Sequence, residues 1–226
     1  MRKIQRLAYI GAIAASALTL AACGGTAAPA SSPAASAPAA APATAAPAAT
    51  NTGVTTNADV FGPACSQLPQ GDAPGSLNNM GPQPVATAAS TNPLLTTLVT
   101  AVKAVPGLPD TLNNTQGITV FAPYNGAFDA VQKQIGAPAF QGLLKDTNKL
   151  GGLLSYHVVG QRYDAKGLVA AGETTELAGG NLTIGGTADA PTITDGQGNT
   201  AKVLCGNIPT SNATVFVIDR ELMPKG

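Results

Sequence analysis

The side chains with the most reactive chemistry in this 226-residue chain are three cysteines and one histidine. Because His157 is the only histidine, a hydrolase would have to use it, with Ser155 or Asp164 as its neighbours in sequence. His157 lies among apolar residues in the segment 153–159, and this pattern is typical of a buried histidine hydrogen-bonded to the backbone. We therefore expect no enzyme and no catalytic residue, with a hydrolase as the least favoured alternative.

No recognisable metal or cofactor site is present in the sequence. A zinc site needs three or four ligands, which one histidine and three dispersed cysteines do not supply. Residues 196–201 match the glycine pattern of a dinucleotide-binding loop, with Asp219 near the position of a ribose-binding acid. That loop requires a helix after it, whereas residues 202–205 are β-like and Asp195-Gly196 favours a hairpin turn. We expect no cofactor and no metal.

Cys23 is the cysteine with the clearest predicted chemistry. It follows Leu20-Ala21-Ala22 and an apolar run over residues 7–20 that begins after three basic residues. Such a run is shorter than the roughly 20 residues of a membrane span, so it predicts a cleaved export signal. A cysteine at the cleavage point resembles a bacterial lipobox, which implies a lipidated, palmitate-bearing N-terminus at Cys23; the alternative is plain secretion.

The other two cysteines, Cys65 and Cys205, form an even set once Cys23 is acylated. Export leads to an oxidising compartment, in which a disulfide between them would persist. The bridge would close a loop of about 140 residues, worth roughly 5 kcal/mol in the chain-entropy treatment of disulfides. We predict that Cys65 and Cys205 are paired.

Charge and aromatic content restrict the partners. The chain has 12 Lys+Arg and 12 Asp+Glu, and loss of Arg2, Lys3 and Arg6 with the signal would leave a net charge of about −3. Tryptophan is absent and aromatic residues make up 4% of the chain. Neither a nucleic-acid footprint nor a polybasic membrane patch is present. The expected membrane partner is lipid, held through acylated Cys23.

Composition divides the chain into four segments. Residues 1–22 are the predicted signal peptide. Residues 23–57 combine Cys23 with an Ala/Pro/Thr-rich stretch without charges, which predicts a disordered stalk open to glycosylation. Residues 58–84 form an N-terminal arm, which Cys65 would pin to the domain. Residues 85–224 have the length and hydrophobic content of one globular domain.

Within that domain, helices are predicted first and strands later. Asn92-Pro93 predicts the start of a helix over 94–105, because Asn is a good N-cap and Pro suits the first helical position. Asn125 is predicted to cap a second helix. Further helices are expected at 148–156 and 166–171, and β-like runs at 118–122, 181–184, 192–194, 201–204 and 214–218. This order predicts an α+β domain with an antiparallel sheet.

Three segments resemble the signatures of fasciclin domains: 119–128 (TVFAPYNGAF), 153–159 (LLSYHVV) and 215–224 (VFVIDRELMP). The resemblance implies a single α+β domain of twisted antiparallel strands wedged against several helices. The lipid-anchored, stalked layout further resembles mycobacterial surface and secreted antigens of this family. Tyr124 and Glu221 depart from the usual pattern, and we expect both to face solvent or a variable surface.

The resemblance implies extracellular adhesion or binding in place of catalysis. We expect a lipid-anchored protein on the extracytoplasmic face of a bacterial membrane, in part shed, with an extracellular protein, a glycan or a second copy of itself as partner. By resemblance to animal members, Tyr156 and His157 are candidate binding residues. The alternative is a carrier of a small lipophilic ligand, which requires an apolar cavity between the 94–105 helix and the sheet.

Overall fold

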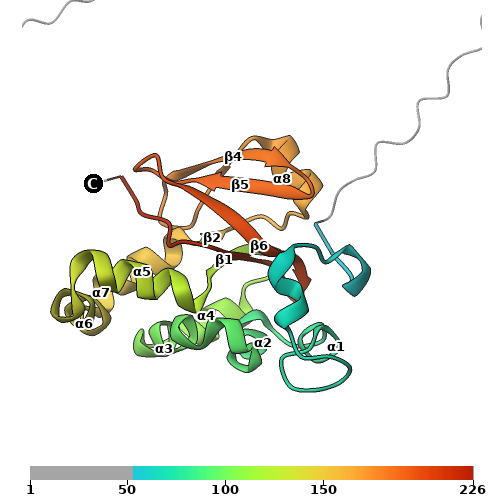
Figure 1. Ribbon diagram of the computed structural model, residues 1–226, viewed down its shortest axis with the longest axis horizontal. Helices are drawn as coiled ribbons and strands as arrows, with labels where there is room; N and C mark the ends of the chain where they lie inside the picture. The colour runs from blue at the N-terminus through green and yellow to red at the C-terminus, as the bar shows by residue number, and fades with distance from the viewer. Residues whose placement is uncertain (1–52, 226) are drawn as a thin grey trace, which may run out of the picture. The chain divides into compact units, whose positions relative to one another are not determined.

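The computed structural model describes residues 53–225 (Figure 1), so Cys23, the predicted signal and nearly all of the predicted stalk lie outside the described residues. The α-helices are α1 (Leu77–Met80), α2 (Val85–Thr91), α3 (Thr96–Ala104), α4 (Leu108–Asn114), α5 (Asn125–Ile135), α6 (Ala137–Lys145), α7 (Thr147–Tyr156) and α8 (Ala165–Ala171). The strands are β1 (Ile118–Pro123), β2 (Val158–Val159), β3 (Glu173–Thr175), β4 (Asn181–Thr187), β5 (Ala190–Thr194), β6 (Thr200–Pro209) and β7 (Ala213–Ile218). The predicted α+β class is confirmed.

The strands form one seven-stranded sheet in the order β2-β1-β7-β6-β5-β4-β3. Every pair is antiparallel except β1 and β7, which run parallel from Ile118 opposite Ala213 to Pro123 opposite Ile218. The prediction of an antiparallel sheet is therefore correct for every strand pair except β1 and β7. Helices α1–α7 lie together below β1 and β2 in Figure 1, whereas α8 lies beside β4 at the other end.

Both faces of strands β1 and β7 are buried. Every residue of β1 and of β7 is buried, as expected for strands covered on two sides. On the helical side, Ile118 and Val215 belong to a large core with helices α2–α7. On the other side, Phe121 and Phe216 pack with ring centroids 6.0 Å apart, within a second core against α8 and β4–β6.

Helix starts follow local capping chemistry in several places. The side chain of Asn92 accepts a hydrogen bond from the Leu94 amide at 2.9 Å, and Pro93 begins a 3₁₀ turn that leads into α3. This confirms the predicted N-cap. Asp146 and Asp164 cap α7 and α8 in the same way, each accepting from an amide three residues later.

Asn125 has a different partner from the one expected. It is the first residue of α5, and its side-chain oxygen accepts hydrogen bonds from the Thr97 amide and the Thr96 hydroxyl, both at 3.0 Å. Its amide group donates to the Pro93 carbonyl at 3.0 Å. Asn125 therefore caps α3, a helix about 30 residues earlier in the chain, because the strand-to-helix corner places it beside that helix start.

The N-terminal residues 53–84 are fastened to β6 and β7. Cys65 is joined to Cys205 by a disulfide, and Phe61 exchanges two backbone hydrogen bonds with Gly206. A Cβ atom at Gly206 would lie 2.4 Å from the Phe61 ring, so only glycine allows this close approach. The Thr214 hydroxyl donates to the Gly53 carbonyl at 2.6 Å.

Within residues 53–225, no single helix is long and apolar enough to cross a membrane. One pair of consecutive helical segments has the length and composition of a membrane span, but the pair is bent by 98° between Val85–Thr91 and Pro93–Ala104.

Candidate functional site

Tyr156 and His157, the candidate binding residues, lie at the end of α7 just before β2. Each side chain is only 2% exposed, so in this conformation neither offers a contact surface to a macromolecular partner. The ring of His157 bridges two backbone groups: Nδ1 lies 2.8 Å from the Leu153 carbonyl, and Nε2 accepts from the Leu222 amide at 2.9 Å. Because Nε2 accepts, Nδ1 carries the proton and donates to Leu153.

Burial controls the charge of His157. Burial lowers its pKa to about 4, against small opposing effects from the Leu153 hydrogen bond and from Asp195. The ring is therefore neutral near pH 7, and both of its nitrogens are taken up by the backbone. The predicted hydrogen-bonded core histidine is confirmed.

The hydrolase alternative fails on the same geometry. A catalytic histidine needs one ring nitrogen available to a nucleophile and the other oriented by an acid, but both nitrogens of His157 are engaged by backbone groups. Asp164, one of the two neighbours considered, accepts from the Gly167 amide at 2.7 Å as the N-cap of α8. In the described part of the chain, no group of three or more His, Cys, Asp or Glu residues could hold a metal ion.

Beside His157, Tyr156 and Asp195 fix the turn between β5 and β6. The Tyr156 hydroxyl accepts from the Gly196 amide at 2.7 Å. Burial raises the pKa of Tyr156, and the charges of Asp195 and Glu176 add to this rise while the Gly196 bond opposes it. The carboxylate of Asp195 accepts from the amides of Gln197 (3.0 Å) and Asn199 (2.8 Å). The glycine-rich segment 196–201 is thus a hairpin turn entering β6, and no helix follows it.

The C-terminal residues are held by this same group of side chains. Asp195 accepts from the Met223 amide at 3.0 Å, and the Gln197 side chain donates to the Pro224 carbonyl at 3.2 Å. Together with the bond from Leu222 to His157, these contacts tie residues 222–224 to α7 and to the β5–β6 turn. The chemistry of Tyr156 and His157 is therefore structural: they lock the end of the chain onto the domain.

Two expectations about exposure were wrong. Glu221 is only 6% exposed, and burial raises the pKa of its carboxyl group to about 7. It follows β7 and precedes the locked Leu222, so it is drawn inward with the tail. Tyr124 is half-buried and packs against the helical core. Its ring lies over Gly126, where an added Cβ would come within 2.3 Å of the Tyr124 hydroxyl oxygen.

An apolar pocket lies where the carrier alternative requires one. Its volume is about 70 Å³, and it lies between α2, α3, α4 and the strands β1 and β7. Its buried wall includes Leu95, Leu98, Leu112, Val120, Leu154 and Val215. The rest of the lining includes half-buried alanines and valines of α2 and α3. Lys103 is the one ionic side chain in the lining.

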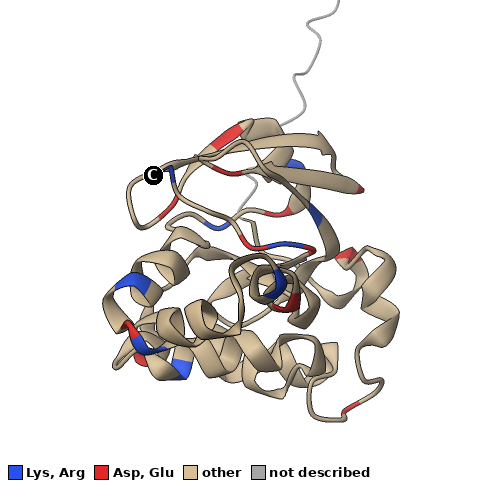
Figure 2. Cartoon of the chain, turned by 60° about the vertical axis from the view of Figure 1, so that its left-hand side comes forward, with Lys and Arg blue, Asp and Glu red and all other residues tan. Residues whose placement is uncertain are grey.

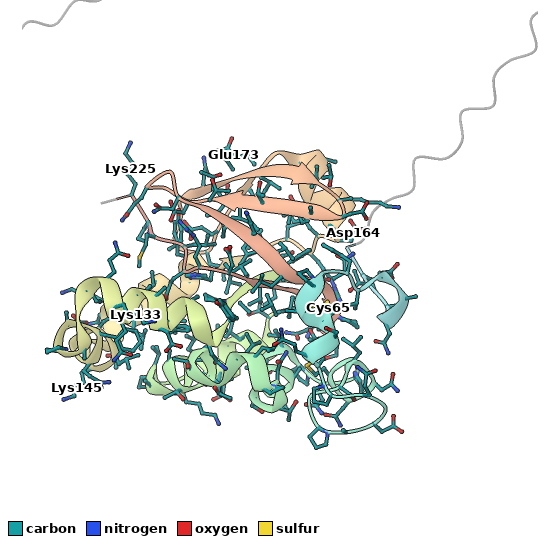
Figure 3. The ribbon with its side chains drawn as sticks, viewed as in Figure 1. Cys65, Lys133, Lys145, Asp164, Glu173 and Lys225 are labelled. Atoms are coloured by element: carbon teal, nitrogen blue, oxygen red, sulfur yellow. A yellow bond between two sulfur atoms is a disulfide. The ribbon has the colours of Figure 1, made fainter. Side chains whose placement is uncertain are left out.

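Helices α5, α6 and α7 form an end of the domain at which many residues are exposed. Apart from Phe140, which packs on Phe128 with centroids 6.4 Å apart, α6 has no buried residue. Ile135, at the end of α5, is 43% exposed. Lys133 and Lys145 project from this end in Figure 3, and basic and acidic segments both lie at the lower left of Figure 2.

Sequence reasoning did not single out Asp195, Lys103 or the α6 surface. Asp195 was read only as half of a turn dipeptide, because its bond to Met223 spans 28 residues. Lys103 is an ordinary last-turn lysine in sequence, and only the packing of α2 and α4 against α3 places it at a pocket. No local pattern carries either signal.

Comparison with known proteins identifies a family and several relatives. The family model of the Fasciclin domain matches residues 93–224. The cell surface glycolipoprotein MPB83 of Mycobacterium bovis is 40% identical over 175 residues, covering 74% of this chain and 73% of that protein. The immunogenic protein MPT70 of Mycobacterium tuberculosis is 37% identical over 177 residues, covering 74% of this chain and 83% of that protein.

Among solved structures, a FAS1 domain pair from the insect cell adhesion molecule fasciclin I is similar in fold. The TM-score is 0.54 at 18% sequence identity, and the alignment covers 62% of this chain and 51% of that one. At this identity the similarity concerns the fold alone.

Proposed function

This chain belongs to the fasciclin domain family, and we propose that it is a cell-surface lipoprotein whose domain acts as a non-enzymatic adhesion module. The members of the family described above are surface antigens and an adhesion molecule, and they are not enzymes. The observation that carries the proposal is the 40% identity, over 175 residues, with a protein named as a cell surface glycolipoprotein. The geometry supports it, because the domain uses His157, Tyr156 and Asp195 for internal hydrogen bonds.

Attachment is proposed through Cys23, which would carry the acyl chains. Two acyl chains hold a protein stably at a bilayer, with each buried methylene contributing about 0.8 kcal/mol. The test is phase partitioning in detergent together with mass spectrometry of the mature N-terminus. We expect a diacylglyceryl mass on Cys23 and loss of detergent partitioning in Cys23→Ser, with Thr26→Ser as the matched control. An unmodified thiol at position 23 would overturn lipid attachment without touching the adhesion proposal.

The contact surface is proposed to be the α5–α7 end. The described chain begins at Gly53, which bonds to Thr214 at the start of β7, whereas α5 leaves the opposite end of the parallel partner β1. In Figure 1 the two ends of the domain are correspondingly far apart. A domain held from its Gly53 side would present the exposed α6 surface outward.

Although Asp129 also lies on this surface, we propose that Lys133 and Lys145 are the residues that contact an acidic partner, either an extracellular protein or a glycan. A third lysine there, Lys149, is already paired with Asp146 at 3.4 Å. The test is binding of beads coated with the mature protein to whole cells and to an immobilised acidic polysaccharide. K133E/K145E should weaken binding at least fivefold, while the matched variant K166E/K202E, on α8 and β6, should not. Equal binding by both variants would remove the α5–α7 end as the contact surface.

Carriage of a small lipophilic molecule is the second candidate function, and the pocket beside α3 favours it. Pockets that enclose a whole drug-sized ligand measure roughly 300–1,000 Å³. At about 70 Å³, this pocket encloses only part of such a molecule. The adhesion module therefore remains the first proposal.

A further inference from the structure

The pocket beside α3 has a specific shape and charge pattern. Its deep wall includes buried leucine and valine side chains from α3, α4, α7 and strands β1 and β7. Its outer part is formed by residues that are only half-buried: Ala86, Ala89, Val99, Val102 and Pro109. The pocket is therefore an apolar recess that continues into a partly exposed apolar rim.

Small side chains are the reason that this recess stays open. Ala86 and Ala89 of α2 face it, where larger residues would fill the space between α2 and α3. Protein interiors are otherwise packed as densely as organic crystals, and an unfilled apolar space costs stability. A ligand that supplies the missing apolar contacts would regain that stability.

Two polar residues in the lining decide what kind of ligand fits. The nitrogens of His157 are both bonded to the backbone, so His157 offers the pocket no free donor or acceptor. Lys103, in the last turn of α3, is exposed and forms no ion pair with any residue between 53 and 225. The recess thus combines an apolar interior with a single cation at its edge.

From this arrangement we infer that the pocket binds the alkyl end of a single-chain fatty acid, with the carboxylate at Lys103. The inference rests on the second candidate function and names its ligand. A volume of about 70 Å³ equals the share of roughly two water molecules. The recess therefore encloses only the end of an alkyl chain, and the rest of the chain lies along the rim between α2 and α3.

The experiment measures binding of sodium butyrate, hexanoate, octanoate and decanoate to the full-length protein, by calorimetry and by amide chemical shifts of α2 and α3. Each methylene that enters the recess should tighten binding about fourfold, and the gain per methylene should fall once the recess is full. Lys103→Gln should weaken octanoate binding two- to fivefold, as expected for an exposed ion pair, and leave 1-octanol unchanged. Lys133→Gln on α5 is the matched control.

Filling the recess provides the decisive variant. Ala89→Leu places a larger side chain at a half-buried position that tolerates it, and Ala86→Leu does so one turn earlier. We expect both to abolish octanoate and octanol binding while the melting temperature holds or rises. Unchanged binding in a folded Ala89→Leu variant, or no saturable binding by wild type, would overturn the pocket. Binding of octanol with no preference for octanoate would overturn the carboxylate assignment while leaving the second candidate function intact.

Discussion

At the residue scale, a single imidazole joins helix α7 to the C-terminal tail. His157 ends α7, donates to Leu153 within that helix and accepts from Leu222 in the C-terminal tail. Each bond satisfies a buried backbone group that would otherwise lose its partner. The ring is neutral near pH 7 because burial lowers its pKa to about 4, and protonation of Nε2 would also break the bond from Leu222. This position requires an uncharged side chain with one donor and one acceptor.

We predict that His157→Ala destabilises the domain by about 3 kcal/mol. The change leaves two buried backbone groups without partners, at about 1–3 kcal/mol each, and opens a small cavity. Urea denaturation at pH 7.5 measures the effect. Ser155→Ala, on the same helix, is the matched control and should shift stability by under about 1 kcal/mol. Equal stability of the two variants would contradict the bridging role of His157.

Residues differed in how far their roles could be predicted from sequence. Asn92 was correctly predicted as a cap because its partner, the Leu94 amide, lies two residues away. Asn125 was assigned to the wrong helix because its partners, Thr96 and Thr97, are brought near it only by tertiary packing. Glu221 was expected in solvent because glutamate is usually exposed. Its burial follows from the hydrogen bond of the next residue, Leu222, to His157, and the local sequence gives no sign of that bond.

At the scale of elements, Asn212 holds two helices against the β6–β7 turn. Its side-chain oxygen accepts from the Val85 amide at 2.9 Å, at the start of α2. Its amide group donates to the carbonyls of Leu112 (2.7 Å) and Thr115 (2.6 Å), at the end of α4. One buried side chain thereby satisfies free groups at the ends of two helices.

Asn212→Ala should therefore cost about 2–4 kcal/mol, because it leaves one buried amide and two carbonyls without partners. Thermal and urea denaturation measure the loss, and amide exchange in α2 and α4 should rise more than in α8. Asn148→Ala, on the exposed side of α7, serves as the control and should be nearly silent. Uniform exchange across all helices would argue against a local clamp.

The disulfide is the second device at this scale. Cys65 and Cys205 are 140 residues apart in sequence. Cross-links over loops of this length contribute about 2–5 kcal/mol. We predict that C65S/C205S lowers stability by that amount and that proteolysis of the variant begins within residues 53–68. As a control, reductant should lower the stability of wild type by the same amount as the double substitution. If reductant left the stability of wild type unchanged, the prediction would be contradicted.

Elements were easier to predict than their pairing. Turn residues and hydrophobic periodicity indicated β1, β4–β7 and the principal helices, because those signals are local. The parallel contact of β1 with β7 joins residues 118–123 to 213–218, and no local pattern reports which distant strand becomes a neighbour. Strand β2, of two residues, was too short to leave a periodic signal.

For the whole molecule, the pH dependence of stability combines two opposing buried groups. His157 has a pKa lowered from 6.5 to about 4. Its unfolded form therefore takes up a proton first, and stability falls as the pH drops from about 6.5 to about 4. Glu221 has a pKa raised from 4.5 to about 7. The folded domain keeps that proton, so this contribution is full below about pH 4.5 and is lost as the pH rises towards 7.

Each contribution amounts to about 3 kcal/mol, and over pH 5–8 the two nearly cancel. We predict that Glu221→Gln loses about 2 kcal/mol of stability between pH 8 and pH 5, since only the His157 contribution remains, whereas the stability of wild type changes by under about 1 kcal/mol. Urea denaturation at both pH values tests this. Glu173→Gln, an exposed change on β3, should follow the wild-type curve. Parallel curves for Glu221→Gln and wild type would show that the two groups do not compensate.

The place of β7 in the sheet has a consequence for biosynthesis. Among residues 53–225 it is the last strand in the sequence, yet it lies between β1 and β6 and hydrogen-bonds to both. Until residue 218 has emerged, the nascent polypeptide has no way to complete its sheet, so this domain matures only after β7 has left the ribosome. Any message cut short before that point yields a product with two open strand edges, which cellular proteases can recognise and remove.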